Sequence, residues 1–299
     1  GDLTVTTGSG ESDIVTGSGN DTVTIQVSTG DIDAVDAKGG TDTLVLTGAS
    51  AGTVNVDLSV ADNVDQLTSI NGVAETLVQQ NFENVDASAM TGGGLIAWAR
   101  NAVAGIGSRI VGSAQNDTIN SGNGADTIQG GGGDDTVVFD ATTDLGGDSI
   151  DGGTGTADAI RLDVGGSYDF TTAGVSISNV EKLAINANQA FTVKLSDNFN
   201  SNNGNVEVIN TSGAATSNAI SIDASAFVGG TGGIIIAAAN NFKGDDSFTG
   251  GGGTDTIVGG VGNDTITSGG GADSIDAGVG DDTLKFRSEE HTSELQSRQ

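Results

Sequence analysis

An aspartate recurs every nine residues near the end of the chain, and this spacing constrains the fold more than any other feature. A glycine stands two residues before each aspartate, and a large apolar residue stands two residues after it. A short period that combines turn-forming glycine with one apolar position indicates a solenoid of tight turns and short strands. The aspartates are Asp246, Asp255, Asp264, Asp273 and Asp282, the glycines are Gly244, Gly253, Gly262, Gly271 and Gly280, and the apolar residues are Phe248, Ile257, Ile266, Ile275 and Leu284.

The same pattern occurs in a second array and, in degraded form, in a third. The unit before the second array has Ser108 where an aspartate is expected. The N-terminal array has one good unit, around Asp21, followed by a break in register before Asp33 and Asp42. The second array contains Asp117, Asp126 and Asp135. Gly124 and Gly133 stand two residues before the last two of these, and Ile119, Ile128 and Val137 stand two residues after the three aspartates.

The nine-residue unit predicts how the aspartates stack. Six residues form a turn, and three form a strand whose middle side chain points inward. Two units complete a coil of about eighteen residues, and coils stack as parallel strands about 4.8 Å apart. Asp246 is therefore expected over Asp264, Asp255 over Asp273, and Asp264 over Asp282. The middle array pairs Asp117 with Asp135 and offers a weaker position at Asp126.

Stacked carboxylates need a cation, and the composition selects its type. At about 4.8 Å and an effective dielectric constant near 20, each pair costs roughly 3.5 kcal/mol before screening. The chain has no cysteine and a single histidine, His291, which leaves oxygen ligands for a hard cation. Calcium–oxygen distances of about 2.4 Å match an ion held between two successive coils. The alternative is that the aspartates only cap turns, which is most plausible for the N-terminal array.

The units GGGGTDTIV and GGVGNDTIT fit the pattern GGxGxDxUx, where U is a large apolar residue. The chain therefore resembles the RTX (repeats-in-toxin) family. The resemblance implies an all-β, right-handed parallel β-roll or β-helix that binds Ca²⁺ in its turns. It also implies a secreted or cell-surface protein of a Gram-negative bacterium, exported unfolded by type I secretion and folding on extracellular calcium.

The repeats divide the chain into arrays and spacers. The spacers hold short β-branched runs and are expected to continue the solenoid as irregular coils, with a helix at Val73–Asn84 as the weaker alternative. The last thirteen residues break every earlier pattern and resemble a translated sequencing adapter. The expected parts are a degenerate array at 1–45, a spacer at 46–102, an array at 103–158, a spacer at 159–240, an array at 241–286 and an artefact at 287–299.

Composition narrows the function. A formal net charge of −30 argues against nucleic acid and anionic membrane as partners, and we expect no membrane insertion. No residues form a recognisable catalytic set, so we expect no enzyme activity in this segment. A structural or adhesive role is favoured, with self-assembly or cell-surface polysaccharide bound through Ca²⁺.

Three other functions stay open. The chain could be the C-terminal RTX part of a secreted protease, lipase or alginate epimerase whose catalytic domain lies elsewhere. It could belong to a pore-forming toxin, although the apolar helices of such a toxin are missing. Outward threonines such as Thr118 and Thr265 could order water as in ice-binding solenoids, but threonine is also an ordinary strand residue.

Overall fold

Every regular element in the described part of the chain is a β-strand, and no helix occurs there. The computed structural model also offers no helix, among these residues, of the length and apolarity needed to cross a membrane. The structure describes all residues except 9–11, 28–32, 60–64, 76, 100–106, 187, 198, 200–203, 213–217, 229–231, 238–241, 287–293 and 297–299.

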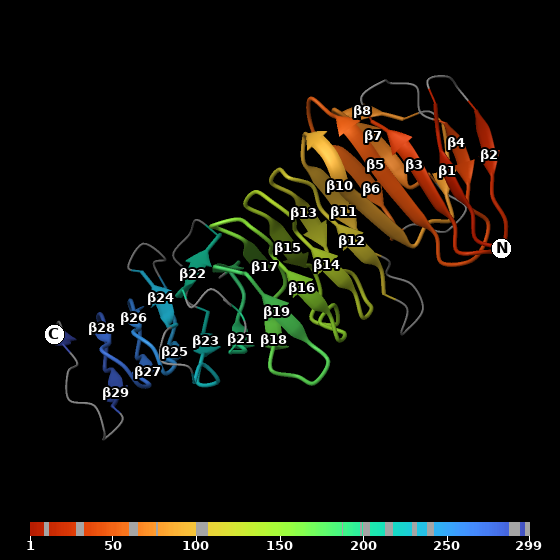
Figure 1. Cartoon of the computed structure of the whole chain (residues 1–299). Coiled ribbons are helices and arrows are strands. Elements are labelled where there is room, and N and C mark those ends of the chain that lie inside the picture. Colours follow the sequence, from red (N-terminus) through yellow and green to blue (C-terminus); the bar gives the residue numbers. More distant parts are fainter. Residues whose placement is uncertain are drawn as a thin grey trace. The chain divides into compact units, whose positions relative to one another are not determined.

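The chain forms two compact units. The first contains Gly1–Val138 and Thr143–Asp158, and the second contains Phe139–Thr142 and Ala159–Gln299. In each unit, short strands from successive coils lie beside one another, as Figure 1 shows.

The strands of the first unit form three hydrogen-bonded series. The first series runs β1-β3-β5-β10-β12-β14-β16, the second runs β2-β4-β9, and the third runs β15-β13-β11-β6-β7-β8. Their bounds are β1 (Thr4–Thr6), β2 (Asp13–Val15), β3 (Thr22–Gln26), β4 (Ala34–Asp36), β5 (Thr43–Ala49), β6 (Val54–Asp57), β7 (Leu67–Ile70), β8 (Val73–Ala74), β9 (Gln79–Gln80), β10 (Asn84–Gly92), β11 (Leu95–Trp98), β12 (Arg109–Val111), β13 (Thr118–Asn120), β14 (Thr127–Gln129), β15 (Thr136–Phe139) and β16 (Ser149–Asp151).

The strands of the second unit form two main series. One runs β17-β20-β22-β24-β26-β28-β30, and the other runs β18-β21-β23-β25-β27-β29. Their bounds, with that of β19, are β17 (Ala159–Leu162), β18 (Gly166–Asp169), β19 (Ser176–Ser178), β20 (Lys182–Ile185), β21 (Phe191–Lys194), β22 (Val206–Asn210), β23 (Ile220–Asp223), β24 (Ile234–Ile236), β25 (Ser247–Thr249), β26 (Thr256–Val258), β27 (Thr265–Thr267), β28 (Ser274–Asp276), β29 (Thr283–Lys285) and β30 (Glu294–Gln296).

The arrays stack in the expected eighteen-residue register. Phe248 pairs with Ile266 and Ile266 with Leu284 on parallel strands. Ile119 likewise pairs with Val137 in the first unit. Side chains alternate along a strand, so in most three-residue strands of the arrays the middle side chain is buried and the two flanking ones are half-buried or exposed. The β-roll expected from the spacing is confirmed.

The core of each unit is the column of middle strand residues. In the last array Phe248, Ile257 and Ile266 are fully buried, and Ile275 is nearly so. Leu284, on the last array strand, is only half-buried. Part of the core of the second unit is aromatic: the rings of Phe139, Tyr168, Phe170 and Phe199 meet edge to face, and Phe191 stacks on Tyr168.

The spacers continue the solenoid, as expected, with one exception. β10 pairs in parallel with β12, and β24 pairs in parallel with β26, so spacer strands join array strands directly. The exception is the hairpin-like run β6-β7-β8, whose ladders are antiparallel.

The helix considered for Val73–Asn84 is wrong. β8 and β9 lie within it and β10 begins at its last residue. The buried Gln66 explains this because its side chain accepts the Phe82 N–H at 2.7 Å and donates to the Phe82 carbonyl at 2.9 Å. These bonds hold the segment extended, so tertiary pairing overrides its local preference.

Within the last thirteen residues the structure describes only β30, which pairs in parallel with β28.

Candidate calcium sites

The repeat aspartates of successive coils stack one above another along the solenoid. We call each such stack a column, and within it each aspartate contacts the aspartate of the next coil. The backbone N–H of one aspartate donates to the Oδ1 atom of the aspartate one coil later. In the second unit this links Asp246 to Asp264 at 2.8 Å, Asp255 to Asp273 at 3.0 Å and Asp264 to Asp282 at 2.9 Å. The stacking predicted from the nine-residue spacing is therefore present in all three expected pairs.

The first unit contains the same contact, extended beyond the predicted pairs. The Asp117 N–H donates to Asp135 Oδ1 at 2.7 Å, across the expected eighteen residues. Asp135 in turn donates to Asp158 Oδ1 at 2.7 Å, and Asp126 donates to Asp148 Oδ1 at 2.8 Å. These two coils are longer, with separations of 23 and 22 residues.

The second carboxylate oxygen distinguishes a structural turn from a cation site. Among the described residues, the Oδ2 atom makes no hydrogen bond in a set of buried aspartates that belong to these columns or, for Asp42, to a further stack in which the Asp21 N–H donates to Asp42 Oδ1 at 2.7 Å. Asp33, outside the columns, also has two buried carboxylate oxygens without a hydrogen bond. A buried carboxylate oxygen without a partner is costly, so it indicates that a ligand belongs there. The aspartates are Asp42, Asp126, Asp135, Asp148, Asp246, Asp255 and Asp264.

Burial shifts the titration of these carboxylates upward. Loss of hydration is the largest cause, and it raises the pKa of Asp246 and of Asp255 to about 7. The same cause, with repulsion from the neighbouring aspartates, raises the pKa of Asp135 and of Asp148 to about 8. A positive ion beside the column would reverse this cost, because it favours the charged form.

The glycines of the repeat let the coils approach. A Cβ atom on Gly250 would collide with Asp255 Oδ2 and with the carbonyl oxygen of Ser268 in the next coil. Gly262, with φ of +147°, lies so close to the Gly244 carbonyl that any side chain would clash. The glycine positions therefore leave room for the carboxylate and bring backbone carbonyl oxygens to the turns of successive coils.

In two of the predicted ligands the second carboxylate oxygen accepts a hydrogen bond. Asp117 Oδ2 accepts the Ser113 N–H at 2.6 Å, and the Ser113 hydroxyl, which the glycine of other units lacks, donates to Asp117 Oδ1 at 3.0 Å. Burial still raises the pKa of Asp117 to about 6. At Asp21, a hydrogen bond from the Thr16 side chain is the main reason for a lowered pKa, and its two oxygens accept the Leu3 and Gly17 N–H groups. Neither aspartate needs a cation to satisfy its second oxygen.

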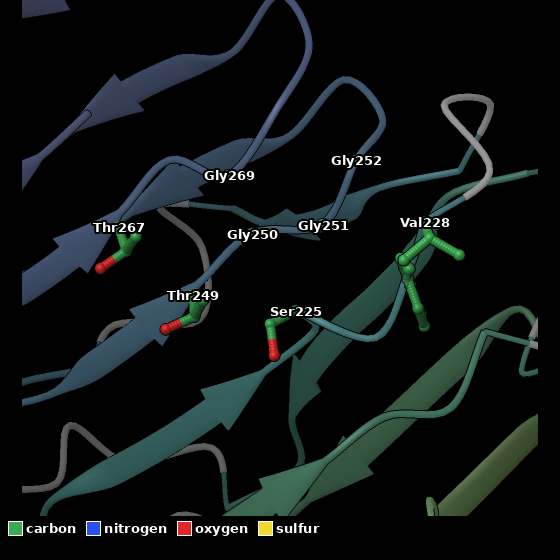
Figure 2. A pocket seen from close by; sticks show the side chains of 9 residues that line it. Ser225, Val228, Thr249, Gly250, Gly251, Gly252, Thr267 and Gly269 are labelled. Atoms are coloured by element: carbon green, nitrogen blue, oxygen red, sulfur yellow. The ribbon is translucent and has the colours of Figure 1, made fainter. Parts of the chain in front are cut away.

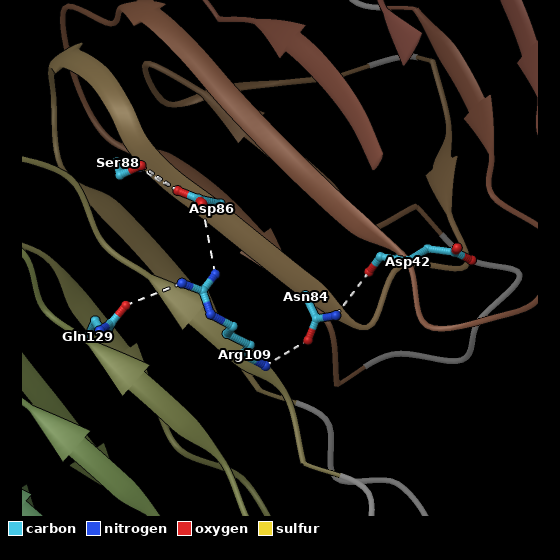
Figure 3. Close-up of polar contacts among 6 residues, drawn as sticks. All are labelled: Asp42, Asn84, Asp86, Ser88, Arg109 and Gln129. Atoms are coloured by element: carbon cyan, nitrogen blue, oxygen red, sulfur yellow. Dashed lines mark hydrogen bonds and ion pairs between the residues drawn. The ribbon is translucent and has the colours of Figure 1, made fainter. Parts of the chain in front are cut away.

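Where Ser108 replaces an aspartate, other contacts hold the coil. The Arg109 N–H donates to Asn84 Oδ1 at 2.8 Å, and the guanidinium reaches Asp86 at 3.8 Å and Gln129 at 3.3 Å (Figure 3). Asn84 also donates to the Asp42 carbonyl at 3.4 Å. A cationic side chain thus links three coils at the point where the carboxylate column is interrupted.

The sequence pattern missed Asp148 and Asp158 as candidate ligands, and it placed Asp42, nine residues after Asp33, only in the degraded N-terminal array. Each of the three is followed two residues later by a strand residue that is buried: Ile150, Ile160 and Leu44. That local signal was available in the sequence, but the nine-residue spacing is lost before Asp148 and Asp158 and, in the N-terminal array, before Asp33.

The number of carboxylates limits what each site can be. No group of three or more acidic, histidine or cysteine side chains suited to a metal occurs among the described residues. A cation in a column would therefore take at most two carboxylates and complete its shell with backbone carbonyl oxygens or water. Calcium accepts six to eight such oxygen ligands in flexible geometry, so the donor set fits it.

Parallel coils with a buried aspartate in each turn define the chain as a β-roll of the cation-binding kind. Residues 105–137 and 249–284 match the family model of the RTX calcium-binding nonapeptide repeat, in four copies. These two segments are RTX repeats, and the chain binds calcium through them. RTX repeats are typical of secreted bacterial proteins. A search of curated proteins found no match.

Proposed function

We propose that the chain is a calcium-dependent structural or adhesive segment of a secreted or cell-surface protein of a Gram-negative bacterium. Calcium in the aspartate columns would hold its coils together, and the role is not catalytic. The observation that supports this most directly is the row of buried Oδ2 atoms without hydrogen bonds, one coil apart, in both units.

The residues that would hold the ions follow from the columns. In the second unit they are Asp246, Asp264 and Asp282 in one column, and Asp255 and Asp273 in the other. In the first unit they are Asp135 with Asp158, and Asp126 with Asp148. Bound calcium would supply positive charge, and these carboxylates, with glycine carbonyls of the same turns, would hold it and so link neighbouring coils.

Calcium dependence would make folding a switch between compartments. Extracellular calcium modules bind with dissociation constants of about 10⁻⁴ to 10⁻³ M. Such sites are empty where calcium is scarce and filled outside the cell, so the acidic chain would stay unfolded during export and fold afterwards. The formal net charge of −30 supports this order, because self-repulsion opposes compaction until cations bind.

An adhesive role would use the same ions between molecules. Two acidic surfaces repel each other, and divalent cations can bridge them. Self-assembly of this chain, or attachment to a cell-surface polysaccharide through calcium, would therefore depend on calcium above the amount needed for folding.

Circular dichroism and isothermal titration test the proposal. The chain in excess chelator should give a largely unordered spectrum, and added Ca²⁺ should restore a β spectrum with measurable heat of binding. Mg²⁺ at the same concentration is the control, because its strict octahedral geometry suits these turns poorly. A β spectrum unchanged by chelator, together with no heat on Ca²⁺ addition, would refute calcium-dependent folding.

A further inference from the structure

A pocket lies on the turn edge of the second unit, outside the carboxylate columns. Its volume is about 490 Å³, within the usual range of small-molecule sites. It is lined by residues of three successive coils (Figure 2): Ser225, Phe227 and Val228, then Thr249–Gly252, then Thr267 and Gly269.

Hydroxyl groups supply the polar part of the lining. Thr249 and Thr267 pair directly on β25 and β27, which places their side chains one strand spacing apart. Ser225 lies beside them on the preceding coil (Figure 2). No hydroxyl of these three residues makes a hydrogen bond within the described part of the chain. Each can both donate to and accept from a ligand.

Apolar side chains and bare backbone complete the lining. Phe227 packs against Gly251, and Val228 is 78% exposed at the rim although it is a large apolar residue. The Val228 backbone is held by a 3.1 Å hydrogen bond from its N–H to Asp197 Oδ1. None of the lining residues carries a charge, in a protein whose net charge is −30. The pocket therefore favours a neutral ligand with both hydroxyl and C–H surfaces.

We propose that this pocket binds a neutral saccharide unit. A sugar ring presents hydroxyl groups at its edge and C–H groups on its face, which matches the threonine pair on one side and Val228 on the other. The repeat of Thr249 and Thr267 along the strand stack fits hydroxyls that recur along an oligosaccharide. A metal ion or an anion would find no charged partner among these residues.

The pocket is built on a candidate calcium turn. Gly250, Gly251 and Gly252 belong to the turn of Asp255, and Gly269 belongs to the stacked turn of Asp273. Asp255 Oδ2 lies directly against Gly250. Saccharide binding should therefore require calcium, and this part of the inference rests on the proposed function. The saccharide itself contacts side chains that hold no ion, so the two roles can be separated.

The test compares Thr249→Val/Thr267→Val with Thr256→Val. Valine keeps the shape of threonine and removes only the hydroxyl, and Thr256 lies on β26, outside the pocket. Calorimetry in saturating Ca²⁺ would use maltohexaose, mannohexaose and galactohexaose as probes, with an alginate oligosaccharide as the anionic comparison. We expect at least one neutral probe to bind, about tenfold more weakly or worse to the double variant, and unchanged to Thr256→Val.

Circular dichroism of each variant in Ca²⁺ and in chelator shows whether it folds. Absence of binding by every neutral probe to a chain that folds with calcium would overturn the saccharide site and leave the proposed function standing. Equal binding to both variants, or binding of alginate alone, would overturn it as well. If the chain fails to respond to calcium at all, the proposed function fails, and binding that persists in chelator would remove only the calcium requirement.

Discussion

Asp264 shows how one residue serves the column. Its N–H donates to Asp282 Oδ1, its Oδ1 accepts the Asp246 N–H, and its buried Oδ2 makes no hydrogen bond. Burial raises the pKa of Asp264 and so does the charge of Asp282, whereas the hydrogen bond from Asp246 lowers it. The Asp264 carboxylate is therefore needed for the stack but destabilised by its own burial and charge, and a cation beside it would stabilise the charged form.

Replacing Asp264 by asparagine should have opposite effects with and without calcium. In chelator, Asp264→Asn removes repulsion within the column and should stabilise the second unit by about 1–3 kcal/mol. In calcium it removes a ligand, and each lost site costs about 4 kcal/mol at a thousandfold excess of calcium over the dissociation constant. Thermal unfolding followed by circular dichroism, in chelator and in calcium, shows whether the substitution raises or lowers the unfolding temperature in each condition.

Asp281→Asn is the matched control for that experiment. Asp281 is the neighbour of Asp282, its side chain is exposed, and its N–H bonds to Asn263 Oδ1. The substitution removes the same charge without touching a column, so unfolding temperatures should change little in either condition. Equal effects of the two substitutions would show that net charge, and not the column, controls stability.

At the scale of the element, the turns make stability depend on pH. The folded-state pKa is raised from the ordinary 3.8 to about 7 at Asp255 and to about 8 at Asp135 and Asp148. Without calcium, the folded state therefore holds protons that the unfolded chain releases. The resulting stability is fully present below about pH 3.8 and is lost as pH rises through 7 to 8.

Unfolding temperatures in chelator should thus fall steadily between about pH 4 and pH 8. With calcium present the trend should reverse, because protons compete with the ion for the same oxygens and calcium affinity rises with pH. Parallel melts across this range, with and without calcium, check both signs. The same slope in both series would mean that calcium does not bind at these carboxylates.

The elements also show what the sequence could and could not predict. Strands with a strict nine-residue spacing, such as those of Phe248 and Ile266, were predictable because each coil repeats one local rule. Asp148 and Asp158 were not, because extra residues loop out of their coils and break the period without altering the column. The strand at Gln79 was hidden as well, since its extended form depends on pairing with Val35, far away in sequence.

At the scale of the whole molecule, the destabilising effect of the negative charge depends on where the acidic residues lie as well as on how many there are. The net charge of −30 is spread over the chain, but the costly part lies in columns whose members are about 4.8 Å apart. The Debye length is about 8 Å at physiological ionic strength and about 3 Å at 1 M salt. The carboxylates of a column are closer together than the Debye length at physiological salt, so dissolved salt screens their repulsion only weakly. Burial weakens this screening further.

Sodium chloride should consequently be a poor substitute for calcium. In chelator, raising NaCl from about 0.15 to about 1 M should increase the unfolding temperature slightly, through relief of the surface charge. Calcium at far lower ionic strength should give the full β spectrum, because it enters the columns and is held by oxygens on two coils. Circular dichroism with NaCl, MgCl₂ and CaCl₂ separates the two effects. Complete folding in NaCl alone would assign calcium's effect to general screening, and the Oδ2 atoms of the columns would then need another explanation.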